Sequence, residues 1–411
     1  MTAPDRAATH APDASPRFPL WLLICASLTA LAPLSIDMYL PSFPALAADL
    51  RVDISRVQLT LGAFLVGLAI GQAFYGPISD RFGRKPPLYI GLLLYAAAAA
   101  GCALAGSVES LMWWRFLEAL GGCAGIVVSR AVIRDRLEAR ESARAFSSLM
   151  LVMGLAPILA PIIGGVLLAA FGWRSIFWVH CGAALLILLL VHRRMEESLD
   201  PRRVQPLHPV SVLRSYGELL RAREFVGYSL AAGCSQAGMF AYIAGSPFVL
   251  IELHGIDPSY YGFVFGANAF GLIFMAQVNA RLVRARPLDS VLRAALFAPC
   301  LAGAVLAVAA LTGTATLPVL LACFFVCLSG MGCILPNASA LALAHQGHRA
   351  GTASALMGTL QFSLGTLAGA AVSFWHDGTA LPLAVVMAVC GAAAVLMRWY
   401  GHAGLARRPA T

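Results

Sequence analysis

Residues 76–85 read G-P-I-S-D-R-F-G-R-K and stand between two long apolar runs at 57–78 and 87–107. Glycines permit tight turns, and Asp80 can accept hydrogen bonds from Arg84 or cap the helix that follows. A transmembrane helix needs about 20 mostly apolar residues, and both flanking runs have that length. This stretch therefore predicts a short polar connection between two membrane-spanning helices.

The same pattern continues along the chain of 411 residues, in which 59% of residues are hydrophobic and only 12% are charged. Soluble domains carry about a quarter charged residues, so we expect an all-α membrane protein whose outer surface faces lipid. The apolar runs predict twelve transmembrane helices, at 20–41, 57–78, 87–107, 110–130, 146–170, 174–192, 225–251, 261–282, 289–312, 316–343, 350–374 and 380–400.

The basic residues predict the orientation. Of the 29 Lys and Arg residues, only Arg51, Arg56 and Arg174 lie in loops on one side, Arg115 lies within a span, and all others fall on the opposite side. We therefore expect a multi-pass protein of the bacterial inner membrane with both termini in the cytoplasm. The net charge of +9 comes from these loops and not from a basic domain with interleaved aromatic residues, so no nucleic-acid partner is expected.

A polar stretch rich in Arg, Glu and Pro divides the spans into two groups of six. A weak internal repeat supports this division. The basic stretch R-L-V-R-A-R-P at 281–287 follows the second span of the second group, just as the 76–85 loop follows the second span of the first group. The predicted units are an N-terminal tail at 1–19, a first half at 20–192, a linker at 193–224, a second half at 225–400 and a tail at 401–411.

Three ionisable residues fall within the predicted spans, namely Asp37, Arg115 and Glu118. Each costs about 2.5–3.5 kcal/mol or more at a helix centre, so such residues are normally paired or line a wet cavity. Asp37 and Arg115 both lie about 7 Å inside the outer boundary and can pair if spans 1 and 4 pack together. Glu118 follows one turn later on the face of Arg115. We expect a proton-coupling site; the alternative is a static ion pair that locks two helices.

The 76–85 string resembles the signature of the major facilitator superfamily between spans 2 and 3. Pro77 and Ser79 depart from that signature at tolerant positions. The resemblance implies the major facilitator fold, with a cavity between two six-helix halves and with this loop as a conformational gate. The matching residues are Gly76, Asp80, Arg81, Gly83, Arg84 and Lys85.

Two further strings narrow the resemblance. Span 4 reads R-F-L-E-A-L-G-G-C-A-G from Arg115, and it resembles the motif whose Arg is linked to proton coupling, with Glu118 in place of the usual Gln. Span 5 reads G-L-A-P-I-L-A-P-I-I-G-G, and it resembles the signature of drug:proton antiporters, with Ala160 in place of a Gly. Prolines within a span produce kinks. The antiporter residues are Gly154, Pro157, Pro161, Gly164 and Gly165.

Together with D-M-Y-L-P at 37–41, these strings resemble the Bcr/CflA subfamily of bacterial drug-resistance transporters. The resemblance implies proton-driven export of small drugs such as bicyclomycin or amphenicols. No G-x-x-x-x-G-K-[ST] loop occurs, so the expected energy source is an ion gradient, without cofactor or metal. The resemblance implies that the ion is the proton and not sodium. The expected protein is a monomer in the lipid bilayer whose partners are protons and a small-molecule substrate.

A substrate cavity in such a protein is apolar and aromatic with a few polar groups. Each candidate below can equally serve in helix packing or in an interhelical hydrogen bond. The candidate cavity residues are Tyr39, Gln236, Phe240, Tyr242, Asn268, Phe270, Asn337 and Gln361.

Other classes of function find less support. An intramembrane enzyme needs a catalytic set, yet neither H-E-x-x-H nor G-x-S-x-G occurs, and His180 has no partner that the sequence suggests. A channel or receptor needs a polar pore ring or a ligand domain. The ten Cys all lie in apolar runs and are expected to be inert thiols. The remaining alternative is a proton symporter that imports a nutrient or metabolite.

Overall fold

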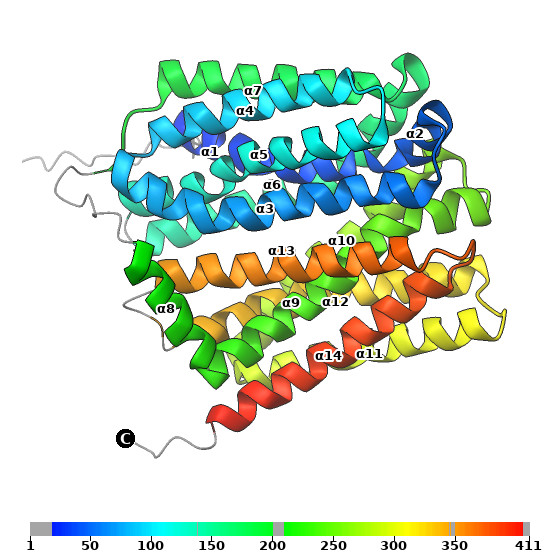
Figure 1. Cartoon of the computed structure of the whole chain (residues 1–411). Coiled ribbons are helices and arrows are strands. Elements are labelled where there is room, and N and C mark those ends of the chain that lie inside the picture. Colours follow the sequence, from blue (N-terminus) through cyan, green and yellow to red (C-terminus); the bar gives the residue numbers. More distant parts are fainter. Residues whose placement is uncertain (1–18, 138, 200–208, 345, 347–349, 406–411) are drawn as a thin grey trace, which may run out of the picture.

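The computed structural model describes residues 19–137, 139–199, 209–344, 346 and 350–405 (Figure 1). All regular elements within these ranges are helical. A bilayer offers no water to pair backbone groups, so a spanning chain closes its hydrogen bonds within helices.

In the first half, α1 is followed by a 3₁₀ turn, η1 (Leu40–Ser42), and by a short helix, α2 (Phe43–Leu50). The six long helices are α1 (Leu20–Asp37), α3 (Ile54–Phe82), α4 (Lys85–Ala103), α5 (Val108–Arg136), α6 (Ala139–Phe171) and α7 (Arg174–Arg194).

In the second half, a short helix, α8 (Pro209–Arg221), precedes the spans, and α9 ends in a π-helical turn, η3 (Phe248–Leu253). The six long helices are α9 (Arg223–Pro247), α10 (Pro258–Ala285), α11 (Leu288–Leu311), α12 (Leu317–Leu343), α13 (Ala350–Phe374) and α14 (Leu381–Leu405).

The all-α fold with twelve spans is confirmed. Within the described residues, eleven helices are long and apolar enough to cross a membrane. The twelfth, α6, is 33 residues long, and its described side chains from Leu155 to Phe171 are apolar. One boundary needs correction, because the connection predicted at 76–85 is mostly helix. α3 continues through Pro77 to Phe82, so only Gly83 and Arg84 link it to α4. A helix can extend past the bilayer because its polar residues are hydrated there.

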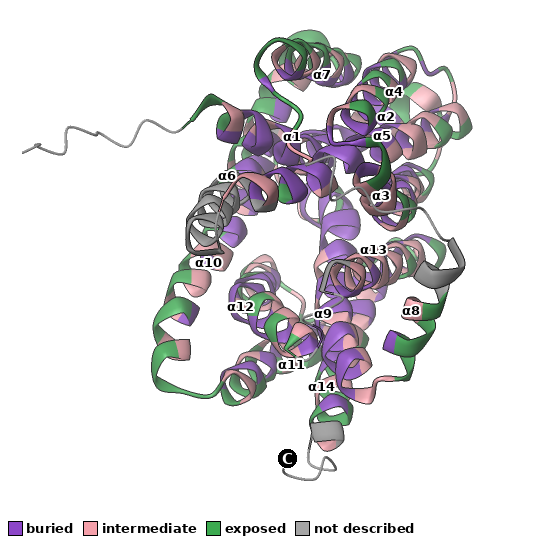
Figure 2. Ribbon diagram, turned by 90° about the vertical axis from the view of Figure 1, so that its left-hand side faces the viewer, coloured by how far each residue is buried: buried purple, intermediate pink, exposed green. Residues whose placement is uncertain are grey.

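The helices pack in two groups that meet along two pairs of helices. α1 and α3–α7 contact one another, as do α9–α14, while α3 lies along α13 and α6 along α10 (Figures 1 and 2). Two described hydrogen bonds cross between the groups. Thr359 Oγ1 donates to the Ala69 carbonyl at 3.4 Å, and Ser373 Oγ donates to Gln58 Oε1 at 3.2 Å. The exact domain boundaries stay a prediction.

The outer surface of the bundle is apolar, whereas buried residues fill the centre of each group (Figure 2). Val166, Phe297 and Leu396 are each at least 60% exposed, on three different spans. Exposed apolar area of this extent marks a surface that contacts lipid or a partner. The chain is therefore a multi-pass membrane protein.

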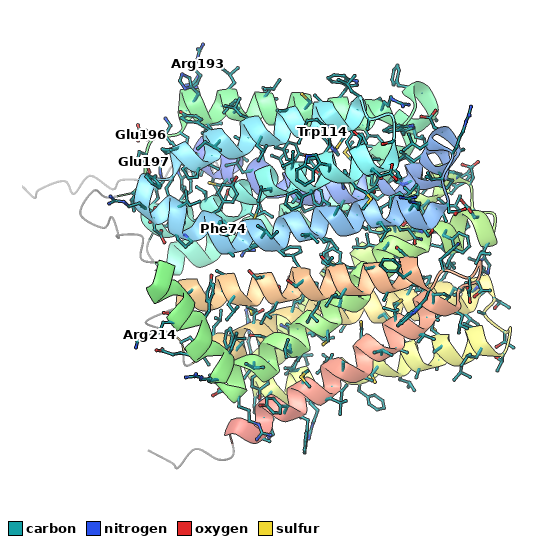
Figure 3. All side chains as sticks on the ribbon, in the orientation of Figure 1. Phe74, Trp114, Arg193, Glu196, Glu197 and Arg214 are labelled. Carbon is teal, nitrogen blue, oxygen red and sulfur yellow. The ribbon has the colours of Figure 1, made fainter. Side chains whose placement is uncertain are left out.

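One end of the bundle carries both terminal helix ends, and we call it the terminal end. The Arg136 guanidinium at the end of α5 lies over the Trp21 ring near the start of α1, at 5.5 Å. The Arg223 Nε at the start of α9 donates to the Tyr400 carbonyl near the end of α14, at 3.0 Å. Figure 3 shows charged side chains at this end, among them the labelled Arg193, Glu196, Glu197 and Arg214. The opposite end is called the outer end.

Candidate functional site

The centre of the first half holds a fully buried ionic cluster. Arg115 and Glu118 lie one turn apart on α5, with Arg115 Nη1 2.6 Å from Glu118 Oε2 and neither side chain exposed. His180 of α7 places Nδ1 3.2 Å from Glu118 Oε1. Both carboxylate oxygens therefore have a nitrogen partner, which favours the ionised form of Glu118.

Aromatic rings enclose the Arg115 guanidinium. Its central carbon lies 4.2 Å from the Phe64 ring centre, 4.8 Å from Tyr39 and 5.7 Å from Phe177. Cation–π attraction is strongest where the cation is desolvated, as here. Arg115 Nη2 also donates to the Ser35 carbonyl at 2.9 Å. One side chain thus joins α5 to α1, α3 and α7.

The predicted pairing of Asp37 with Arg115 is wrong. Arg115 instead pairs with Glu118 and with the Ser35 carbonyl. Asp37 is 4% exposed and has no hydrogen bond or ion pair within the described part of the chain. The reason is rotation about the helix axis, because residues two positions apart on a helix point to different sides. The Ser35 side chain is hydrogen-bonded to Tyr95 of α4, so Asp37, two positions further along α1, points to a different side.

Asp37 faces the second half instead. Its carboxyl lies within electrostatic range of the Tyr242 and Tyr261 phenols, on α9 and α10. The η1 turn, three residues further along, contacts the same two helices. Tyr242 is held in turn by Asn268, whose Nδ2 donates to its hydroxyl at 2.8 Å. A buried carboxyl without a described partner thus lies where the two halves meet.

His180 is the member of this cluster that the sequence did not suggest. It is 2% exposed and sits six residues into α7, about 9 Å from the helix start at 1.5 Å per residue. Glu118 lies ten residues into α5, about 15 Å from its start by the same rise. The two residues therefore differ in depth by about 6 Å, a distance that their side chains can bridge, so a comparison of depths predicts the contact.

The gate loop forms a second ionic cluster, at the terminal end. Arg84 is 3% exposed, and it donates to Asp80 Oδ1 at 2.6 Å and to Asp135 Oδ2 at 2.8 Å. The hydrogen bond between Arg84 and Asp80 agrees with the sequence reading, whereas Asp135 of α5 was missed. Arg84 also bonds Ser79 at 3.0 Å, so this side chain fastens α3, α4 and α5 together.

Gly83 and Glu197 complete the gate loop. Gly83 has a φ of 90°, which favours glycine, and an added Cβ would lie 2.8 Å from Glu197 Oε2. That carboxylate accepts the backbone amides of Arg84 and Lys85 at 2.9–3.0 Å, at the start of α4. Burial raises the pKa of Glu197, but these amides and those of Leu199 and Ser198 outweigh burial and hold its pKa below the usual value. Of the other gate residues, Arg81 is exposed and Gly76 lies within α3.

We expect Glu197→Gln to loosen the start of α4. The lowered pKa of Glu197 means that its stabilisation is complete above the usual Glu pKa of about 4.3 and is lost as pH falls through the lowered value. Hydrogen exchange at the Arg84 and Lys85 amides should therefore be faster in the variant at pH 7, and in the wild type only in acid. Glu196→Gln is the control, since that side chain is 91% exposed. Equal exchange in both variants would contradict the role of Glu197.

The antiporter residues lie on α6, where the helix crosses the end of α1. Pro157 and Pro161 are inside the helix, Gly165 is buried, and Gly154 lies among the α6 positions whose side-chain surroundings are not described. Gly164 contacts the Met38 carbonyl so closely that a Cβ has no room. This contact fixes the chain immediately after Asp37.

Gly164→Val should therefore displace the end of α1. The Cβ would meet main-chain atoms of Met38, which cannot move aside as a flexible side chain can, and the two methyl groups add further bulk. We expect transport to be lost, with a lower melting temperature in detergent. Gly172→Ala is a milder control at a turn, where an added Cβ has open space but the positive φ strains Ala. Wild-type transport by Gly164→Val would show that the contact has no role.

The candidate cavity residues do not gather in one place. Tyr39 belongs to the ring cage around Arg115, with its hydroxyl 2.7 Å from Thr60 Oγ1. Phe270 is 62% exposed and stacks on Phe274, apart from the buried polar groups, so its assignment to a shared pocket is not supported. Asn337 exchanges hydrogen bonds with Asn279, with Nδ2 2.6 Å from its partner oxygen.

Five candidates remain near the interior of the second half. Phe240 packs against Phe362 of α13 with ring centres 5.9 Å apart, and Gln236 lies one turn before it on α9. Gln361 precedes Phe362 and is half-buried. With the Tyr242–Asn268 pair, these residues come from α9, α10 and α13, the helices that contact the first half.

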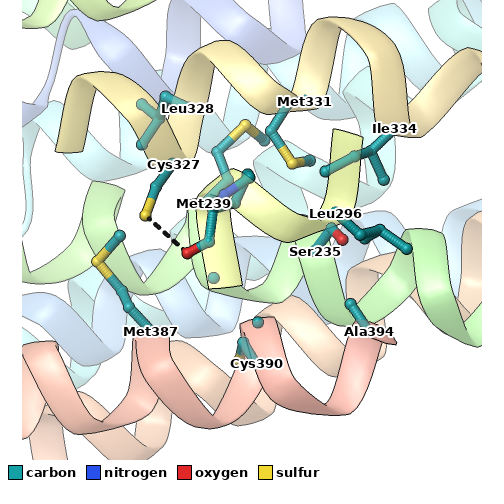
Figure 4. Close-up of a pocket in the computed structure, with 13 residues that line it drawn as sticks. Ser235, Met239, Leu296, Cys327, Leu328, Met331, Ile334, Met387, Cys390 and Ala394 are labelled. Carbon is teal, nitrogen blue, oxygen red and sulfur yellow. Dashed lines mark hydrogen bonds between the residues drawn. The ribbon is translucent and has the colours of Figure 1, made fainter. Parts of the chain in front are cut away.

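One described cavity lies inside the second half, between α9, α11, α12 and α14 (Figure 4). Its volume is about 30 Å³, whereas drug pockets span about 300–1,000 Å³. None of the candidate cavity residues lines it. The lining side chains include Ser235, Met239, Cys327, Met331, Met387 and Cys390.

Comparison with known proteins defines the class. Residues 25–370 match the family model of the Major Facilitator Superfamily, and the chain belongs to this family of transporters. An uncharacterized MFS-type transporter of Bacillus subtilis is 38% identical over 92% of this chain and 94% of its own length. A bicyclomycin resistance protein homolog of Haemophilus influenzae is 34% identical over 93% and 96%. These matches confirm the resemblance to drug-resistance members of the superfamily.

Solved structures confirm the fold. The D-xylose-proton symporter superposes with a TM-score of 0.71 at 17% identity, over 92% of this chain and 97% of that one. A bacterial homolog of the human lysosomal transporter Spinster, inward-facing and occupied, gives 0.69 at 14% identity, over 94% and 96%. The fold agrees with the family match, by which the chain is a transporter and not an enzyme.

Proposed function

We propose that this transporter exports small drugs, of the bicyclomycin or amphenicol kind, in exchange for protons across the bacterial inner membrane. The observation that carries the proposal is Asp37, a buried carboxyl without a described partner between the halves of a protein related to drug-resistance transporters. Intramembrane carboxyls of this kind mark proton relays and substrate pathways.

The orientation in the proposal places the terminal end in the cytoplasm. The basic residues gather at that end, as the positive-inside rule requires. The transporter acts as a monomer, needs no cofactor and draws its energy from the proton gradient.

Alternating access supplies the mechanism. The halves rock about the contacts of α3 with α13 and of α6 with α10, and expose the space between them to each side in turn. When that space opens outward, a proton from the periplasm binds Asp37 and the drug leaves. When it opens inward, Asp37 releases the proton and a new drug binds. A ligand drives this cycle only through different affinities for the two states.

The contacts of Arg115 support a role other than proton binding. Arg115 does not pair with Asp37, because it already pairs with Glu118. Arg115 positions α1 through the Ser35 carbonyl, two residues before Asp37. Arg115 is thus a positioning residue, and Asp37 carries the proton.

Inverted membrane vesicles test the proposal. The vesicles are prepared from cells that express the chain, and a pH-sensitive dye reports the pH of their interior. When antibiotics are added one at a time, a transported drug should release protons from that interior. Vesicles without the protein are the control. If no antibiotic moves protons but a nutrient does, the protein is a symporter and the export proposal is wrong.

A further inference from the structure

Three buried hydroxyls lie together between α9 and α10, and we call them the hydroxyl cluster. Tyr242 and Ser246 are four residues apart on one face of α9, Tyr261 lies three residues into α10, and all three are 0% exposed. Ser246 Oγ lies 2.9 Å from the Tyr261 hydroxyl and also interacts with the Tyr242 hydroxyl. Asn268 Nδ2 donates to Tyr242 at 2.8 Å. The hydroxyls therefore form a chain that begins at an amide donor.

The hydrogens of the hydroxyl cluster can be counted. Three hydroxyls carry three hydrogens, and the two contacts of Ser246 use two of them. Asn268 brings its own hydrogen to Tyr242. One hydroxyl hydrogen is therefore left over, and no hydrogen bond of the described residues supplies an acceptor for it. A buried donor without an acceptor is unfavourable, so this hydrogen requires a partner.

Asp37 is an acceptor of the kind that the hydroxyl cluster lacks. An ionised carboxylate only accepts hydrogen bonds, and Asp37 is buried without one in the described part of the chain. Its carboxyl interacts electrostatically with both phenols, Tyr242 and Tyr261. A surplus donor of the second half and an unpaired acceptor of the first half thus face each other.

A short stretch of α6 holds both sides in place. Gly164 packs on the main chain directly after Asp37. Ile162 packs on Gly262, the residue directly after Tyr261, where an added Cβ would lie 2.9 Å from the Ile162 backbone nitrogen. Asp37 and Tyr261 are thus each one residue away from a close contact with the same turn of α6, which independently brings the carboxyl and the hydroxyl cluster together.

The other ionisable groups near the end of α1 have partners of their own. Arg115, Glu118 and His180, from α5 and α7, bind one another. The buried residues that α6 and α7 place against Met38 are apolar. Among the described residues, the ionisable groups that interact with Asp37 are therefore the two phenols of the hydroxyl cluster.

We propose that the hydroxyl cluster is the hydrogen-bond partner of Asp37, and that it donates its surplus hydrogen to the carboxylate when Asp37 is ionised. The bond joins the halves at the end of α1, directly or through one water molecule. Hydrogen bonds to a charged acceptor are roughly twice as strong as neutral ones, so this bond weakens when a proton neutralises Asp37. Tyr242 and Tyr261 are thus positioning residues. The inference rests on the proposed function, because it describes how that transporter holds its proton site.

The double variant Tyr242→Phe with Tyr261→Phe removes both phenolic hydroxyls and keeps the rings. Both rings pack on Phe265, with ring centres 5.7 and 5.9 Å away, so the apolar contacts remain. Tyr260→Phe is the matched control, because Tyr260 is the neighbour of Tyr261 on α10 but is 65% exposed. Circular dichroism and gel filtration first establish that both variants fold.

Infrared titration of the purified protein in lipid vesicles gives a pH profile without a transport substrate. The carboxylic acid band that disappears in Asp37→Asn reports protonated Asp37. In the double variant this band should persist to a pH about one unit higher than in the wild type, because the ionised form has lost its donor. Tyr260→Phe should match the wild type. A band that titrates identically in the double variant and the wild type overturns the proposal, as does an equal shift in Tyr260→Phe.

A second measurement follows the tyrosines of the wild type. With ring-labelled tyrosine, the C–O stretching band of the phenols should change over the pH range in which Asp37 titrates, and in Asp37→Asn this change should be absent. An unchanged tyrosine band in the wild type across that range overturns the proposal even if the double variant does not fold. If instead Asp37→Asn keeps full proton-coupled export, the proposed coupling residue is at fault, which the vesicle assay shows separately from the infrared result.

Discussion

Asp37→Asn is expected to abolish drug-driven proton movement while the protein still folds. Asn has nearly the same shape but cannot carry a proton, and Asp37 makes no described hydrogen bond that the change would break. Without a proton carrier at this position nothing is exchanged for the drug, so the dye signal should fall to that of vesicles without the protein. The measurement is the dye signal in inverted vesicles, together with antibiotic resistance of cells that express the variant.

The matched control for this variant is Asp49→Asn. Asp49 also follows α1 but lies at the outer end, where its carboxylate accepts from Arg174 at 2.7 Å and from Trp173 at 3.1 Å. Those hydrogen bonds hold the pKa of Asp49 below its usual value, so it stays ionised throughout the working range. Asp49→Asn should keep most of the activity. Full resistance in Asp37→Asn would remove Asp37 from the coupling site.

Arg115→Met should give the largest loss of stability. Met fills similar space among the rings of Phe64 and Phe177 but leaves the Glu118 carboxylate with His180 as its one remaining described hydrogen-bonding nitrogen partner. Removal of one partner from a buried ion pair costs about 3–5 kcal/mol. The midpoint of thermal unfolding in detergent, followed by intrinsic fluorescence, is the measurement.

A double variant shows whether the cost comes from the charge. Arg115→Met with Glu118→Gln removes both charges, and replacement of a complete buried pair is often nearly neutral. The double variant should therefore recover most of the stability that Arg115→Met loses. If it is as unstable as Arg115→Met alone, the lost contacts to the rings and to Ser35 dominate, and the ion pair contributes little.

The sequence by itself determined the features that depend on the bilayer. A membrane requires helices of a minimum length, so the apolar runs located the spans, although the helix ends differ from the predicted ones by up to seven residues, at the start of α6. The gate hydrogen bond between Asp80 and Arg84 was also predictable, because the two residues are only four apart and stand on either side of the short turn at Gly83.

Only the tertiary structure decided which partners the buried charges have. Depth in the membrane follows from position along a helix, and it placed Asp37 and Arg115 at similar levels. The direction of a side chain follows from rotation about the helix axis, and a span as uniformly apolar as α1 contains little information about that angle. The contact of Gly164 with Met38 and the bond from Arg115 to Ser35 set the rotation, which turns Asp37 toward Tyr242 and leaves Glu118 to Arg115 and His180. These contacts join residues about 80 to 130 positions apart, so local sequence could not reveal them.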